Sequence, residues 1–229
     1  MLVLCWSAKG GSGTTVVTAC LALLHADTDV GVLAIDLAGD LPAVLGLAEP
    51  TGPGVLDWLT ASPPPADGAL RSITASTGCG VDLVGRGHLT DPTRTEDDGS
   101  MPAGLAGVPD EAWERLAHAL VAERRPVVVD AGLGVPPPPL RAAATASLLV
   151  ARPCYLGLRR ASRVSAAATG VVLVDEPGRA LGRRDVEAAL GVPVVAETLV
   201  DPAVARAVDA GLLRSRVPSA FSRSLRNAA

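Results

Sequence analysis

Short apolar runs rich in Val, Leu and Ile alternate along the chain with longer segments of mixed polarity. Such runs are typical of strands buried on both faces of a parallel sheet. They are Leu2–Trp6, Gly31–Asp36, Val81–Val84, Pro126–Asp130, Ser147–Ala151, Gly170–Val174 and Pro193–Ala196. The spacing leaves room for helices between them. The pattern therefore predicts an α/β fold, with a doubly wound, mostly parallel sheet and helices on both faces in a Rossmann-like three-layer arrangement.

The intervening segments carry helical patterns. A helix is expected over residues 14–25, and a second over 110–124, where Asp110 can cap the start and Pro126 stops the helix. The apolar stripe of this second helix is formed by Trp113, Leu116, Ala117, Leu120 and Val121. Residues 85–109 contain Asp-Pro and Met-Pro steps and an acidic run, which predicts a surface loop.

Composition narrows the classes of protein. The 229 residues are 48% hydrophobic and 19% charged, which is typical of a folded globule, and we expect residues 1–229 to form a single domain. Only 2% are aromatic, which argues against a module that stacks bases on aromatic side chains. No apolar stretch is long enough for a membrane span, and no basic leader precedes one, so a cytoplasmic location is expected.

Charge is distributed unevenly along the chain. Residues 1–151 hold 8 basic and 17 acidic side chains, whereas residues 152–229 hold 12 basic and 7 acidic ones. This asymmetry has two interpretations: an uneven but solvated surface, or a basic C-terminal third that faces an anionic surface, either DNA or the inner face of a membrane.

The segment 7–15, Ser-Ala-Lys-Gly-Gly-Ser-Gly-Thr-Thr, follows a predicted strand and precedes a predicted helix. Glycines let successive backbone N–H groups converge on one point, and the positive end of the following helix points there too. Taken alone the segment fits an ordinary flexible turn, but its position between strand and helix favours a phosphate-binding loop.

Lys9 adds weight to this interpretation. The chain has 20 basic residues, of which 19 are Arg and one is Lys9. A lysine ammonium contacts phosphate oxygens as a compact point charge, unlike the planar fork of arginine. The alternative is that its placement is due to chance.

This loop resembles that of the deviant Walker A group of P-loop ATPases, which includes ParA and MinD. The family loop reads Lys-Gly-Gly-x-Gly-Lys-Thr, and the matching residues are Lys9, Gly10, Gly11, Gly13 and Thr15. The resemblance covers most of the chain in motif order, because Asp36 and Asp130 each close a predicted strand.

The resemblance implies ATP or ADP and Mg²⁺ as cofactors. The phosphates would be cradled by the backbone of Gly10, Gly11, Ser12, Gly13, Thr14 and Thr15. The Thr15 hydroxyl would bind Mg²⁺, with Asp36 and Asp130 holding its water shell. Lys9 would reach across a homodimer interface to the partner's nucleotide. Asp175 would lie near the adenine, and Asp201 either lies there too or caps the following helix.

Two departures from the family pattern bear on hydrolysis. Thr14 replaces the P-loop lysine that touches the β- and γ-phosphates, and such a charge-assisted contact contributes roughly 1.5–3 kcal/mol. The second carboxylate of the family's Asp-x-Asp switch, which positions the attacking water, is replaced by Ala38. Asp40 substitutes for it only if the loop is shortened and re-aimed. Weak or absent ATP turnover with residual Mg-nucleotide binding is therefore expected.

The loop form Lys-Gly-Gly-x-Gly-x-Thr is similar to that of the TadZ/CpaE branch, which localises pilus secretion machinery, and septum-site-determining MinD-like proteins are the neighbouring possibility. The TadZ/CpaE branch carries a receiver-like domain at its N-terminus, and we expect this chain to resemble that branch without the domain, because the first predicted strand begins near Met1.

Two features of the C-terminal third remain open. Residues 147–163 predict a strand, a turn at Arg152-Pro153 and a helix with Arg159, Arg160 and Arg163, which form either a solvated basic face or a contact for a partner or phosphate. In the tail, Phe221 and Leu225 either dock onto the domain or anchor a short membrane-seeking helix.

The leading hypothesis is an ATP-binding positioning protein that dimerises around nucleotide and recruits a protein partner. One alternative is a pseudo-ATPase scaffold that binds no nucleotide. Another is an ATP-dependent synthetase of the same fold group, which would need an intact phosphate-clamping lysine and acid/base residues.

Overall fold

The computed structural model describes residues 1–26, 30–66, 68–87, 105, 107–226 and 228. Within this part of the chain, eight strands form one sheet in the order β3-β4-β2-β5-β1-β6-β7-β8. The strands are β1 (Leu2–Ser7), β2 (Val32–Asp36), β3 (Ala75–Ser76), β4 (Val81–Val84), β5 (Val127–Leu133), β6 (Ala146–Ala151), β7 (Gly170–Asp175) and β8 (Val194–Leu199). All pair in parallel except β3, which is an antiparallel edge strand.

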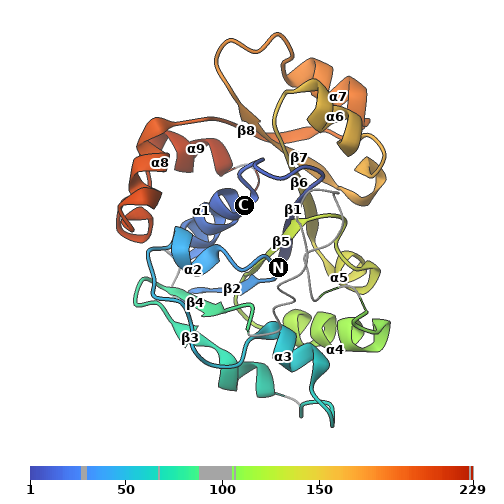
Figure 1. Cartoon of the computed structure of the whole chain (residues 1–229), viewed down its shortest axis with the longest axis vertical. Coiled ribbons are helices and arrows are strands. Elements are labelled where there is room, and N and C mark those ends of the chain that lie inside the picture. The colour runs from blue at the N-terminus through green and yellow to red at the C-terminus, as the bar shows by residue number, and fades with distance from the viewer. Residues whose placement is uncertain (27–29, 67, 88–104, 106, 227, 229) are drawn as a thin grey trace.

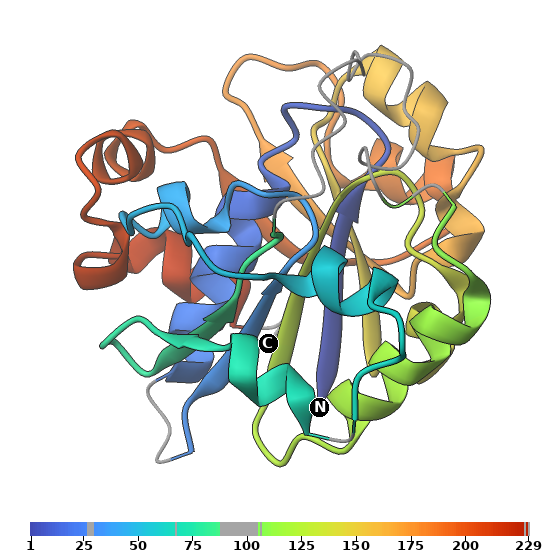
Figure 2. The ribbon, with the colours of Figure 1, turned by 60° about the horizontal axis from the view of Figure 1, so that its bottom comes forward.

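Helices cover both faces of this sheet (Figures 1 and 2). The α-helices are α1 (Thr14–Ala26), α2 (Leu41–Val44), α3 (Val55–Thr60), α4 (Asp110–Val121), α5 (Pro138–Ala143), α6 (Tyr155–Ala161), α7 (Arg183–Leu190), α8 (Pro202–Asp209) and α9 (Ser219–Leu225). Short 3-10 helices span Ala69–Ile73, Ser165–Ala167 and Leu213–Ser215. The fold class predicted from the alternation of runs is therefore confirmed.

Two apolar cores lie on opposite faces of the sheet. Alternate residues of β1 divide between them: Leu2, Leu4 and Trp6 belong to one core, and Val3 and Cys5 to the other. The first core is covered by α3, α4, α5, α6 and α7, and the second by α1, α2, α8 and α9. Because β1 is buried on both faces, its sequence is a continuous apolar run, as expected of a central parallel strand.

The strand order places a binding edge beside β1. From β1 the chain moves to β2 and β4 on one side of the sheet, while β6, β7 and β8 follow on the other. Ligands of open α/β sheets bind at the carboxyl ends of the strands near such a change of direction. Ser7, Asp36 and Asp175 end three of these strands, so they lie at this edge.

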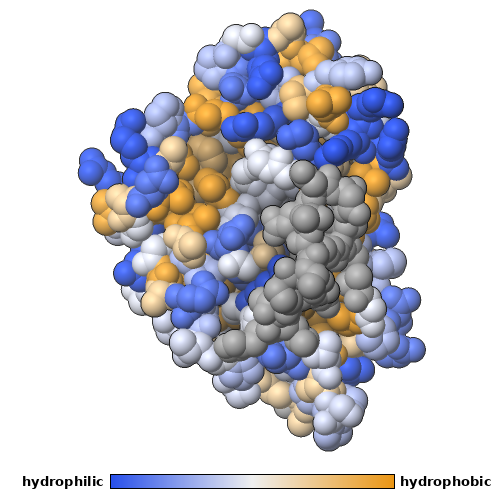
Figure 3. Space-filling view, viewed as in Figure 1, coloured by the Kyte–Doolittle hydropathy of each residue, from blue (hydrophilic) through white to orange (hydrophobic). Residues whose placement is uncertain are grey.

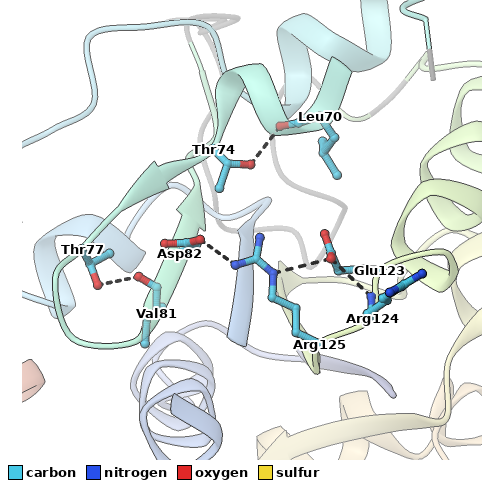
Figure 4. A network of polar contacts seen from close by, with 8 residues as sticks. All are labelled: Leu70, Thr74, Thr77, Val81, Asp82, Glu123, Arg124 and Arg125. Carbon is cyan, nitrogen blue, oxygen red and sulfur yellow. Dashed lines mark hydrogen bonds and ion pairs between the residues drawn. The ribbon is translucent and has the colours of Figure 1, made fainter. Parts of the chain in front are cut away.

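At the opposite edge of the sheet, a polar network around Arg125 connects neighbouring segments of the chain (Figure 4). The Arg125 Nη1 atom lies 2.5 Å from Oδ2 of Asp82, and its Nε atom lies 3.7 Å from Oε1 of Glu123. Arg125 precedes β5 and Asp82 lies in β4, so the ion pair connects two strands that are separated by β2. This network lies away from the glycine-rich loop between β1 and α1, and it connects strands of the sheet.

Helix α4 departs from its prediction in two details. Asp110 does not cap it: the N-cap is Pro109, which makes no side-chain cap hydrogen bond, and Asp110 is already the first helical residue. Val121 does not join the apolar stripe, since it is 60% exposed at the last turn. Val121 lies at the edge of the stripe as the last residue of the helix, where the core no longer covers it. Most of the predicted loop at 85–109 lies outside the described residues.

The C-terminal tail docks onto the sheet. Phe221 and Leu225 of α9 are buried in the second core, where α9 contacts α1 and β8. Docking, one of the two interpretations of the tail, is what the structure shows. In the part of the chain that the structure describes, no helix combines the length and the apolar character required to cross a bilayer.

Candidate nucleotide-binding site

The loop from Ala8 to Gly13 connects the end of β1 to the start of α1 at the binding edge. Gly11 and Gly13 have φ angles of 74° and 91°, which side-chain-bearing residues rarely adopt. A Cβ added at Gly10, Gly11 or Gly13 would meet nothing within 4 Å, so the space over the loop is open. Glycine is therefore required at positions 11 and 13 by backbone conformation, and the open space allows a ligand to approach the backbone.

Two hydrogen bonds fix the shape of the loop. The Ser12 Oγ donates to the Lys9 carbonyl at 2.7 Å, and the Val17 amide donates to the Gly13 carbonyl at 3.0 Å. Ser12 is 6% exposed, so its side chain belongs to the frame of the loop. Its predicted contribution to phosphate binding is through its backbone.

Lys9 is half-buried beside this loop. Its Nζ donates to the Gly10 carbonyl at 3.3 Å, and no ion pair of the described residues includes it. The ammonium therefore keeps donors for an anion. Its predicted reach to the nucleotide of a second subunit stays a prediction.

Thr14 and Thr15 open α1. Thr14 is 7% exposed, and its carbonyl accepts from the Thr18 Oγ1 at 2.9 Å. The Thr14 side chain is uncharged, so the residue that matches the P-loop lysine of the resembled family supplies no cation. Thr15 is half-buried, and its side chain is close enough to Asp130 to lower the pKa of that carboxyl.

Asp36 is fully buried at the end of β2 and organises the loop that follows. Its Oδ1 accepts from the amides of Ala38 (3.1 Å) and Gly39 (2.7 Å), and its Oδ2 accepts from the Leu41 amide at 3.1 Å. Burial raises the pKa of Asp36 to about 6, although these three hydrogen bonds act in the opposite direction. Holding the loop between β2 and α2 is therefore its role in the folded chain.

Asp130 lies directly beside Asp36 in the sheet register and beside Cys5 on the other side. Its Oδ1 accepts from the Gly132 amide at 3.0 Å, while its buried Oδ2 has no hydrogen-bond partner. Burial, together with the nearby charge of Asp36, raises the pKa of Asp130 to about 7. A buried polar atom without a partner is uncommon and needs a physical explanation.

A divalent cation fits this arrangement. Mg²⁺ prefers oxygen ligands and is commonly bound by one or two carboxylates together with substrate phosphates. The orphaned Oδ2 of Asp130, the neighbouring Asp36 and the nearby Thr15 hydroxyl are oxygen donors of this kind. Among the described residues no group of three or more His, Cys, Asp or Glu could hold a metal ion, so phosphate and water would have to complete the shell.

The predicted catalytic residue Asp40 lies on the loop that Asp36 holds. Its side chain is exposed and makes no cap hydrogen bond to α2, and its charge contributes to the raised pKa values of Asp36 and Asp130. Arg86 holds the same loop from outside, since its Nη1 donates to the Ala38 carbonyl at 2.7 Å. The loop is short, but nothing in this geometry aims Asp40 at a particular water, and its catalytic role stays a prediction.

Two other predicted residues lie at the same edge. Asp175 ends β7, and its Oδ1 accepts from the Glu176 amide at 2.9 Å. Asp201 caps α8 by accepting from the Ala203 amide at 2.7 Å, so the capping interpretation of Asp201 is confirmed. The contact between Asp175 and adenine stays a prediction.

A pocket of about 210 Å³ opens beside the loop, between Lys9–Ser12, the end of β6 and the start of α6. Its charged lining residues are Lys9, Arg152 and Arg179. In Figure 3, hydrophilic side chains border the pale surface of the glycine-rich loop on the side of α6 and α7. Sequence reasoning treated Arg152 only as a turn residue and did not consider Arg179. The available signal was that Arg152 directly follows a strand that ends at the binding edge.

Comparison with known proteins supports the fold. No family model matches the chain, and no curated protein matches its sequence. Among solved structures, a ParA family ATPase from Chlorobium tepidum superposes with a TM-score of 0.75 at 19% identity, over 98% of this chain and 95% of that one. MinD from Pyrococcus horikoshii, a septum site-determining protein complexed with Mg-ADP, gives 0.73 at 18% identity, over 99% and 93%.

A third similar structure is a complex of MinD with MinC from Aquifex aeolicus, with a TM-score of 0.69 at 19% identity, over 92% of this chain and 86% of that one. The chain therefore has the P-loop α/β fold of the ParA and MinD ATPases. The resemblance identified from the loop motif is confirmed at the level of the fold.

Proposed function

We propose that this chain binds a nucleoside triphosphate with Mg²⁺ at the loop 8–15 and uses the bound nucleotide to control its association with other molecules. The observation that carries the proposal is the unpartnered, buried Oδ2 of Asp130 beside an open, glycine-built loop. The Mg-ADP complex of the similar P. horikoshii MinD supports the choice of ligand.

Each part of the site has a distinct task in this proposal. The backbone amides from Gly10 to Thr15 and the start of α1 bind the phosphates, because they form a positive N-terminal site. Thr15, Asp36 and Asp130 hold the cation, which neutralises phosphate charge when it is bound. Lys9 adds a positive charge at the open side of the loop.

Hydrolysis is slow or absent in this proposal. Ala38 has no side chain that accepts a proton or orients water, and Thr14 supplies no cation for charge that develops on the phosphates. Asp40 lies exposed on the neighbouring loop and is the one carboxylate there that could orient water if the loop moves. The chain then acts through nucleotide occupancy and much less through turnover.

The biological output in this proposal is the location of a partner. The similar A. aeolicus MinD forms a complex with MinC, and the MinD from P. horikoshii is named for septum-site determination. By analogy, this chain forms a nucleotide-dependent homodimer that recruits a protein partner, for septum positioning, partition or pilus localisation of the TadZ/CpaE type. The Arg-rich C-terminal third would meet DNA or a membrane surface.

Calorimetric titration with Mg-ATP tests nucleotide binding. We expect saturable binding to the wild type that requires Mg²⁺ and is weakened in Asp130→Asn, because this variant loses the charge of the cation ligand. The matched control is Asp110→Asn, an exposed carboxylate at the start of α4. Absence of heat and of any ATP-induced thermal shift in the wild type would contradict the proposal and favour a scaffold that binds no nucleotide.

A further inference from the structure

The pocket beside the loop is unusual in its charge. Its lining includes Lys9, Arg152 and Arg179 and no acidic residue. Arg179 is paired with Glu176, with 2.7 Å between Nη2 and Oε2, and that pair is exposed at the surface. Lys9 and Arg152 take part in no ion pair of the described residues.

Arg152 has a buried donor without an acceptor. Its Nε atom is inaccessible to solvent and has no hydrogen-bond partner among the residues described. The residue follows β6 directly, so its backbone is fixed by a central strand of the sheet. The pKa of Glu176 is lowered mainly by its hydrogen bond and charge interaction with Arg179, and only in smaller part by the charge of Arg152.

The size and shape of the pocket fit a ligand larger than a single water. A water needs only about 10–15 Å³ of such space, against about 210 Å³ here. Gly157 of α6 helps to keep it open: a Cβ there would come within 2.9 Å of Cys154 Sγ and 3.9 Å of Lys9 Cδ. The pocket therefore extends the open surface of the loop toward α6.

We propose that this pocket binds a phosphate group of the nucleotide, and that Arg152 supplies from the same chain the cation that Thr14 does not. The inference rests on the proposed function and names a phosphate-binding residue within it. A guanidinium binds phosphate oxygens through several donors at once, and Arg152 lines the pocket. Arg179, already paired with Glu176, contributes less.

Substitution of Arg152 tests this assignment. In Arg152→Gln, we expect the affinity for Mg-ATP to fall roughly ten- to hundredfold, which corresponds to one lost charge-assisted contact. Arg152→Lys should recover part of the loss, and Arg179→Gln should cause a smaller one. Arg184→Gln, which removes an exposed charge from α7 outside the pocket, is the matched control and should leave the affinity unchanged.

A double-mutant cycle with position 14 distinguishes replacement of the lysine from a general effect of charge. In a Thr14→Lys background the P-loop cation is restored, so Arg152→Gln should cost only a severalfold loss of affinity. Equal losses in both backgrounds would overturn the claim that Arg152 replaces that lysine. Thermal unfolding without ligand checks the fold, and Arg152→Gln should unfold no earlier than the wild type, because it removes a buried donor that has no partner.

The failure of this inference is distinguishable from failure of the proposed function. If the wild type binds Mg-ATP and Arg152→Gln binds it equally well, the inference is wrong and the function stands. If the wild type binds tripolyphosphate through Arg152 but not ATP, the pocket is a phosphate site and the nucleotide proposal is wrong. Binding of neither ligand, nor of inorganic phosphate, would overturn both.

Discussion

At the scale of single residues, Asp130 is in surroundings that favour its neutral form. Burial raises its pKa to about 7 and that of neighbouring Asp36 to about 6, both from an ordinary value of 3.8. Between pH 4 and 7 the folded chain therefore retains protons that the unfolded chain releases. The free energy of unfolding of the ligand-free protein should fall as the pH rises through this range.

Asp130→Asn should remove much of this pH dependence. At pH 7.5 without Mg²⁺, we expect the variant to be more stable than the wild type by about 1–4 kcal/mol, since one pKa unit corresponds to about 1.4 kcal/mol. Urea unfolding at several pH values from 4.5 to 8 measures the effect, with Asp110→Asn as the control. A variant with the same slope of stability against pH as the wild type would show that Asp130 titrates normally.

Position 14 offers a gain-of-function prediction. Thr14→Lys should raise the affinity for Mg-ATP by roughly ten- to hundredfold, because it restores a cation where the family contacts the β- and γ-phosphates. Thr14→Gln is a control of similar length without the charge and should leave the affinity unchanged. Calorimetry measures both, and a Thr14→Lys variant that binds no better would place the phosphates elsewhere.

At the scale of elements, the sequence predicts the sheet well because each central strand is buried on both faces. Val127, Val128 and Val129 are all fully buried, so an uninterrupted apolar run in the sequence predicts this strand. Short edge strand β3, Ala75–Ser76, is exposed and carries no such signal. β3 forms because it pairs with β4, and the sequence of residues 75–76 alone does not predict this pairing.

The candidate site is predictable from the sequence only in part. Asp36 and Asp130 are found because the resembled family carries carboxylates on these two strands in the same motif order. The prediction that Asp130 closes its strand is wrong, since β5 continues to Leu133. Arg152 and Arg179 are missed because the pocket that unites them is formed by tertiary packing of the loop against β6 and α6. The three amides that bind Asp36 depend likewise on a loop conformation that spacing alone does not show.

Helix α9 allows a prediction about the docked tail. Phe221 is 5% exposed in the core between α1 and β8, so Phe221→Ala should lower the free energy of unfolding by roughly 3–5 kcal/mol. Arg223→Ala, an exposed neighbour on the same helix, should change it by less than about 0.5 kcal/mol. Urea denaturation compares them. A Phe221→Ala variant as stable as the Arg223→Ala control would show that the tail is undocked in solution.

At the scale of the whole molecule, the cations lie around an open site. Lys9 and Arg152 are both without ion pairs in the described part of the chain, and both line the pocket beside the glycine-rich loop. Cations close together repel one another, so an anion bound among them relieves that repulsion. In the proposed homodimer, a triphosphate has enough charge to be shared between two copies of this edge, which would couple nucleotide binding to dimerisation.

This proposed coupling predicts how the oligomeric state of the protein depends on nucleotide. The wild type should shift from monomer toward dimer on addition of Mg-ATP, and Lys9→Ala should weaken this shift by at least tenfold in protein concentration, because each subunit then lacks the ammonium that would meet its partner's nucleotide. Arg184→Ala should dimerise as the wild type does, since its exposed charge lies on α7 outside the pocket. Light scattering over a range of protein concentrations, at the same saturating nucleotide, measures the change. Dimers that form equally well without nucleotide, or in Lys9→Ala, would mean that association uses a different surface and that the loop does not control it.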